Sequence, residues 1–258
     1  MSTTNRTARW LALTLAMVFP SLLTWVYFVW LHDSRSQWQQ VAFGIGKFLQ
    51  FFLPVIFVLW FRREKLNRGR LARPPADATN IYEGQQPSVP KNWNGTLLGI
   101  VFGLAVVIAI FAIFFIFLPH PTRSQLTGAV RDRILSLGID NLWKYVGLSV
   151  FYAAVHSFLE EYYWRWYVFD ELRSFFSETV SNLFSSLGFM AHHVIVLACF
   201  LGWQSPLTYL FSLGVASGGI AWAWLYGRDG HLRNAWLSHA IVDAGIFGLG
   251  FVLVRQTL

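Results

Sequence analysis

The stretch TLLGIVFGLAVVIAIFAIFFIFL, residues 96–118, contains 23 residues and no charged side chain. A helix of about 20 apolar residues is long enough to cross the hydrocarbon core of a bilayer, which is about 30 Å thick. The whole chain has the same character, because 55% of its 258 residues are hydrophobic and only 13% are charged. Soluble domains usually carry about 25% charged residues. The sequence therefore predicts an integral membrane protein.

Apolar blocks of similar length recur along the chain. Seven of them are long enough to cross, or nearly cross, a membrane. They cover about residues 10–31, 41–61, 96–118, 142–169, 183–202, 206–226 and 235–254. The segment 125–141 is shorter, charged and amphipathic, which is typical of a helix lying at the membrane interface. We predict an all-α fold, a polytopic transmembrane helical bundle of about seven or eight spans.

Positive charge is concentrated in one short segment. The net charge is +7, and much of it lies in RREKLNRGRLARPP, residues 62–75. Beside a membrane span, such a segment more often marks a cytoplasmic loop facing anionic lipid than a nucleic-acid site, so we expect no nucleic-acid partner. We divide the chain into residues 1–95, an N-terminal membrane hairpin plus basic cytoplasmic loop, and residues 96–258, a core bundle. The single cysteine excludes an intrachain disulfide.

Ionisable residues within spans are rare and mark functional paths. The first cluster here lies in SFLEEYYWRWYVF, residues 157–169. Glu161 and Arg165 are four residues apart on one helical face, so they can pair. Glu160 points about 100° away from Glu161 and is left for chemistry. His156 precedes Glu160 by four residues and shares its face. The alternative is that this cluster lies at the headgroup level, with Arg165 reaching toward water.

Two further clusters lie in later spans. His192 and His193 occur together about ten residues into the fifth block, and Phe189 shares a face with His193. His239 and Asp243 are four residues apart in the seventh block. Each group could simply satisfy itself structurally. Following the chain from the basic cytoplasmic loop, however, all three clusters reach similar depth in the same leaflet, so we expect them to converge.

Two kinds of chemistry fit such a cluster. Carboxylates and histidines are good ligands for zinc or iron, although the H-E-x-x-H spacing of zinc proteases is absent. The alternative is metal-free hydrolysis, in which a glutamate takes a proton from water. A neighbouring histidine would share that water, and a second histidine would stabilise the oxyanion.

The three motifs resemble those of the CAAX protease and bacteriocin-processing family, also called CPBP or Abi. The family pattern appears here in order as Glu160-Glu161-x-x-x-Arg165, Phe189-x-x-x-His193 and His239-x-x-x-Asp243. The resemblance covers about residues 145–250. It implies a glutamate-type intramembrane endopeptidase that uses no cofactor and no metal, with residues 96–258 forming a CPBP-like catalytic bundle.

The resemblance also implies a role for each motif residue. Glu160 would be the general base and His193 would help to activate the water. His239 and Asp243 would form the oxyanion-stabilising side, although Asp243 could instead orient or charge His239. The supporting residues would be Glu161, Arg165, Phe189 and His192.

The implied partners are the lipid bilayer and a peptide or lipidated-protein substrate of unknown identity. The implied location is the plasma membrane of a prokaryote, with the active site toward the cytoplasm. Two alternatives stay open. One is a non-enzymatic membrane binding or immunity protein that keeps the pocket, and the other is a metal-dependent membrane hydrolase at the same residues.

Overall fold

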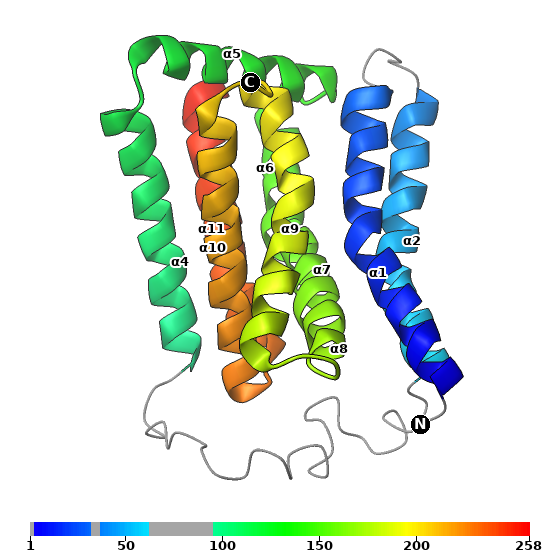
Figure 1. The fold of residues 1–258 in the computed structure, drawn as a ribbon. Helices are drawn as coiled ribbons and strands as arrows, with labels where there is room; N and C mark the ends of the chain where they lie inside the picture. The colour runs from blue at the N-terminus through cyan, green and yellow to red at the C-terminus, as the bar shows by residue number, and fades with distance from the viewer. Residues whose placement is uncertain (1–2, 32–36, 62–94) are drawn as a thin grey trace.

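A computed structural model describes residues 3–31, 37–61 and 95–258, so the basic segment 62–75 lies outside the described residues. These three ranges contain helices and no strand, which confirms the predicted all-α fold (Figure 1). The helices are α1 (Thr3–Trp25) with η1 (Val26–Trp30), α2 (Gln37–Phe61), α4 (Gly95–Ala112) with η3 (Ile113–Phe117), α5 (His120–Ser136), α6 (Leu142–Val150), η4 (Phe151–His156), α7 (Ser157–Glu161), η5 (Tyr162–Phe169), α8 (Asp170–Leu172), α9 (Glu178–Leu201), α10 (Pro206–Asp229) and α11 (Leu232–Val254).

Within residues 3–31, 37–61 and 95–258, six helices are long and apolar enough to cross a membrane, which confirms a polytopic bundle. They are α1, α2, α4, α9, α10 and α11, with η1 and η3 continuing α1 and α4. The short helix α5 lies across the end of the bundle that also holds the C-terminus (Figure 1), as expected for an interfacial helix. The N-terminus lies at the opposite end of the bundle.

The helical run from α6 to α8, residues 142–172, is the seventh long element. It alternates between α-helical turns and the wider π-helical turns of η4 and η5. Such wide turns are rare and occur often at functional sites. The run begins where the Asn141 side chain accepts a hydrogen bond from the Lys144 backbone N–H at 3.1 Å. Lys144 also donates a hydrogen bond to Asp140 and thereby lowers the pKa of that exposed carboxyl.

The core lies where this run meets α9, α10 and α1. Tyr163, Trp164 and Phe169 of η5 are completely buried, as are Leu13 and Ala16 of α1. The inner face of η5 is therefore aromatic, whereas the outer faces of the bundle carry many exposed apolar side chains. That distribution is typical of a protein solvated by lipid.

The N-terminal helix is joined to the core by polar contacts as well. Arg9 forms a buried ion pair with Glu171 at 2.6 Å and donates to the Ser174 hydroxyl. The Tyr163 hydroxyl donates to the Ala16 carbonyl at 2.7 Å. The division of the chain near residue 95 stays a prediction, but α1 packs directly on the elements that hold the candidate site.

Two glycines set the close approach of α4 to α11. A Cβ on Gly99 would lie 2.6 Å from the backbone oxygen of Asn234, and one on Gly103 would lie 2.9 Å from that of Ser238. Backbone atoms cannot move aside as a side-chain end can. These small residues therefore fix the position of α11, as small residues do at helix contacts in membranes.

We expect Gly99→Ala to destabilise the protein by about 1–3 kcal/mol, because α4 and α11 must separate. The measurement is thermal unfolding in detergent. Gly248→Ala is the matched control on α11, since a Cβ there meets nothing within 4 Å. Equal melting temperatures for the two variants would contradict the assigned contact.

Candidate active site

Glu161 links two buried cationic or imidazole groups. Arg165 Nε lies 3.2 Å from one carboxylate oxygen of Glu161, and His239 Nδ1 lies 2.8 Å from the other. Glu161 and Arg165 are completely buried. The guanidinium also lies 4.8 Å from the ring centre of Phe189 and 5.5 Å from that of Trp222. The predicted Glu161–Arg165 pair is present, and His239 is its additional partner.

Glu160 is 3% exposed and is surrounded by imidazoles from three helices. Its Oε1 lies 3.4 Å from His192 Nε2 and 3.9 Å from His156 Nε2. Its Oε2 lies 3.8 Å from His239 Nε2. These separations exceed those of ordinary hydrogen bonds. They are typical of polar groups that share a bridging water or substrate atom.

The two neighbouring glutamates diverge less than the sequence suggested. Both are buried, and both reach His239, Glu161 at 2.8 Å and Glu160 at 3.8 Å. Neighbouring Cα–Cβ bonds on a helix diverge by about 100°, but the long glutamate side chains let both carboxylates approach one imidazole. The alternative of a headgroup-level cluster does not fit Arg165, which is 0% exposed.

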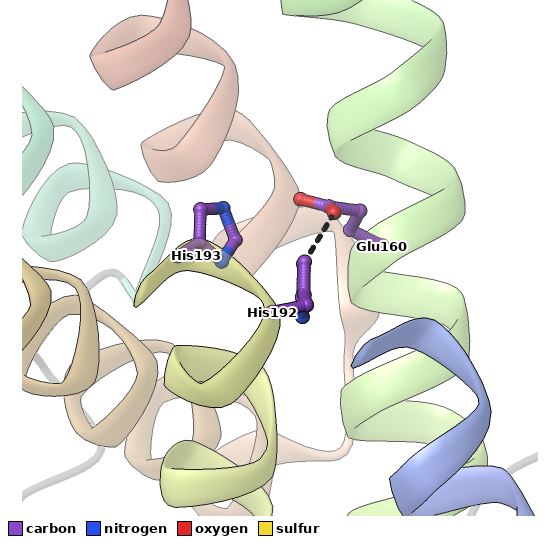
Figure 2. A group of neighbouring side chains, drawn as sticks. All are labelled: Glu160, His192 and His193. Atoms are coloured by element: carbon purple, nitrogen blue, oxygen red, sulfur yellow. Dashed lines mark ion pairs between the residues drawn. The ribbon is translucent and has the colours of Figure 1, made fainter. Parts of the chain in front are cut away.

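The histidine pair on α9 faces Glu160, as Figure 2 shows. His192 is the member at ion-pairing distance, and neither of its nitrogens has a hydrogen bond among the described residues. His193 Nδ1 contacts the Phe189 carbonyl at 2.9 Å, and the two rings lie 4.5 Å apart. A carbonyl can only accept, so His193 donates from Nδ1 and its Nε2 is the acceptor. The predicted Phe189–His193 contact is present.

Asp243 and His239 also meet as their spacing predicted. Asp243 Oδ1 lies 3.7 Å from His239 Nε2. Carboxylates of Glu161, Glu160 and Asp243 thus face both nitrogens of this ring. Since ionised carboxylates only accept hydrogen bonds, an imidazolium that donates from both nitrogens matches these surroundings.

Trp222 of α10 is a site residue that the sequence did not indicate. Its ring stacks on His239 with centroids 4.0 Å apart and an interplanar angle of 12°. Its Nε1 donates to the buried Ser238 hydroxyl at 3.1 Å. The apolar stretch around Trp222 carries no ionisable residue and no recognisable spacing, so only the packing of α10 against α11 could reveal this contact.

The same cluster offers a set of metal ligands. Glu160, His192 and His193 each present one ligand atom, and these atoms lie within 4.8 Å of one another. A carboxylate with two imidazoles is a donor set that suits zinc or iron. The residues present therefore fit a metal ion as well as a metal-free site.

Residues 142–245 match the family model described as type II CAAX prenyl endopeptidase, Rce1-like. The matched segment contains the Glu160, Phe189 and His239 motifs and excludes α1 and α2. No curated protein and no solved structure matches the chain. This match supports the CAAX protease family, also called CPBP, as the family of the segment 142–245.

Proposed function

We propose that this protein is an intramembrane endopeptidase in which Glu160 activates a water molecule without a metal ion. The observation that carries the proposal is the position of Glu160, a buried carboxylate faced by imidazoles from three helices at 3.4–3.9 Å. A general base must lie within reach of the proton that it removes, directly or through one water. The family match supports peptide hydrolysis as the reaction class.

In the proposed reaction, the water binds between Glu160 and His193. Glu160 takes one proton from this water. The water oxygen forms a bond to the scissile carbonyl carbon at the same time. The Nε2 of His193 is oriented by the Nδ1 contact to Phe189 and accepts the other water proton as a hydrogen bond. Glu160 then returns its proton to the leaving nitrogen, and the C–N bond breaks to give an acid and an amine.

His239 stabilises the oxyanion in this proposal. The side chain of Glu161 accepts from Nδ1 and holds the ring, while Trp222 stacks on its face. Nε2 then donates toward the developing negative charge. Such a pre-oriented donor is worth about 2.7–4 kcal/mol of transition-state stabilisation. The carboxylate of Asp243 keeps His239 protonated and oriented, and it does not itself donate a hydrogen bond to the oxyanion.

We further propose that the site opens toward the cytoplasm of a prokaryotic cell. The helix α1, whose first turns carry Arg6 and Arg9, begins at the end of the bundle where α2 ends, and the basic segment 62–75 follows α2 in the sequence. Positive charge of this density favours the cytoplasmic side. The substrate on this proposal is a peptide or lipidated protein presented from that side.

A metal-dependent hydrolase is a second candidate, because the ligand atoms of Glu160, His192 and His193 lie within 4.8 Å of one another. Metal analysis of the purified protein separates the two candidates. Stoichiometric zinc or iron, together with activity that is lost in chelator and restored by that metal, would favour the second. Full activity in chelator-treated, metal-free protein would exclude it.

We expect Glu160→Gln to lower kcat for cleavage of a farnesylated model peptide by at least about 10²–10⁴-fold, because the amide cannot accept the water proton. Product release is followed by mass spectrometry, and folding by thermal unfolding in detergent. Glu178→Gln, at the exposed start of α9, is the matched control. Full cleavage by a folded Glu160→Gln protein would show that another group activates the water. A cellular phenotype that is unchanged in cells carrying Glu160→Gln would point to a binding or immunity protein.

His193→Gln and His192→Gln test the division of labour on α9. The first removes the oriented Nε2 acceptor and is expected to lower kcat by about 10²-fold or more. The second changes a ring that contacts Glu160 and is expected to have the smaller effect on kcat. Steady-state kinetics of both proteins decide the order, and a reversed order would assign the water-activating role to His192.

Arg165→Met removes the guanidinium from the buried Glu161 carboxylate and leaves it with His239 alone, so we expect a loss of about 3–5 kcal/mol in stability. The matched control is Lys144→Met, which removes the cation of the exposed Lys144–Asp140 pair, also four residues apart. Both proteins are compared by thermal unfolding. Similar melting temperatures would show that the buried pair is not a structural support.

A further inference from the structure

Lys47 is the only charged residue in the candidate span Val41–Leu59. It belongs to α2, outside the segment that matches the family. Because helices rise about 1.5 Å per residue, Lys47 lies about 9 Å inside the candidate span, measured from Val41. An ionisable residue at such depth is costly and marks a functional site by default.

The surroundings direct Lys47 toward the bundle interior. Its Nζ lies 5.7 Å from the ring centres of both Phe43 and Phe51, one helical turn before and after it. The Phe43 ring stacks on Tyr27 of η1 at 4.0 Å. The Phe51 ring meets Tyr163 of η5 edge-on at 6.2 Å. The face of α2 that carries Lys47 is therefore the face packed on the core.

The same face of α2 is connected to Glu160 through the side chains of Phe51 and His156. The Phe51 ring lies edge-on to His156 at 6.3 Å, and His156 Nε2 lies 3.9 Å from Glu160 Oε1. Lys47 is therefore connected to the Glu160 cluster through the Phe51 and His156 side chains. Lys47 nevertheless forms no ion pair or hydrogen bond with any residue in the described ranges 3–31, 37–61 and 95–258. Its ammonium group is a donor beside the site without an acceptor of its own in the described chain.

We propose that Lys47 binds the free C-terminal carboxylate of the substrate peptide. This inference rests on the proposed function and names the substrate group that α2 recognises. In a C-a-a-X end the carboxylate lies three residues from the prenylated cysteine, at most about 10 Å away in extended chain. A charged hydrogen bond in an apolar setting is the interaction that such a carboxylate requires.

Position favours a peptide carboxylate over a lipid phosphate as the bound anion. Lipid phosphates lie at the membrane surface, whereas Lys47 lies about 9 Å inside its candidate span and is held between two phenylalanine rings on the inner face. A peptide that reaches Glu160 brings its own carboxylate to this depth. Gly46, next to Lys47, leaves room for the Leu23 side chain of α1.

The test compares one farnesylated C-a-a-X peptide in two forms, with a free C-terminal carboxylate and with a C-terminal amide. Full-length protein in detergent is expected to cleave the acid with a kcat/KM about 10–100-fold higher than the amide, the size of one charged hydrogen bond. Lys47→Met is expected to reduce this acid-to-amide ratio to about one, mainly through KM, and Lys47→Arg to restore most of it. The control Lys144→Met keeps the wild-type ratio.

A binding measurement keeps this test separate from that of the proposed function. The fluorescent acid and amide peptides are titrated into Glu160→Gln protein with and without Lys47→Met, and anisotropy gives both affinities. The proposal is supported if Lys47→Met abolishes the preference for the acid peptide in binding. If no peptide is cleaved in the separate activity assay, only the proposed function fails. Equal affinities of the acid and the amide for Glu160→Gln protein that keeps Lys47 overturn the proposal. The proposal is also overturned if Lys47→Met lowers the affinity for both peptides equally and does so only when anionic lipid is present. That result assigns Lys47 to a lipid phosphate.

Discussion

The buried chain Arg165–Glu161–His239 is the interaction on which the rest of the site depends. Glu161 uses one carboxylate oxygen for Arg165 and the other for His239, so it joins the central helical run to α11. No member of this chain is more than 4% exposed. Removing one partner from such a group strands a charge in an apolar interior, which is far more costly than breaking an exposed pair. The position of Glu160, the residue before Glu161, is therefore held by its neighbour.

The aromatic rings around this chain serve the same purpose. Phe189 and Trp222 cover the Arg165 guanidinium, and Trp222 also stacks on His239. An arginine over aromatic faces is stabilised where water is excluded. The aromatic composition of η5 and α9 thus makes the buried charges tolerable, and those charges in turn orient the imidazoles around Glu160.

Much of the site could be predicted from sequence because its residues follow helical spacing. The pairs Glu161–Arg165, Phe189–His193 and His239–Asp243 each lie four residues apart, and all three contacts are present. The helix α5 (His120–Ser136) was likewise visible as a shorter, charged segment between two apolar blocks, predicted at residues 125–141, and its interfacial position stays a prediction. The catalytic roles of these residues stay predictions, since spacing gives proximity and not chemistry.

Contacts between helices could not be read in this way. The link from Glu161 to His239 joins residues 78 positions apart. Trp222 and Lys47 carry no motif, and their relation to the site arises only because α10 packs on α11 and α2 turns its Phe43–Phe51 face inward. The position of α11 further depends on Gly99 and Gly103, whose G-x-x-x-G spacing in an apolar helix indicates a close helix contact but does not name the partner helix.

The sequence by itself determined that the chain is a helical membrane protein and that three of its helices carry ionisable groups at similar depth. Both conclusions depend on local properties, since helix length and i,i+4 neighbours are set by the chain's own geometry. The tertiary structure alone decided which of these groups meet. Glu160 faces His192, His156 and His239 because helices distant in sequence are held together by buried charge and close glycine contacts, and no local pattern encodes such a contact.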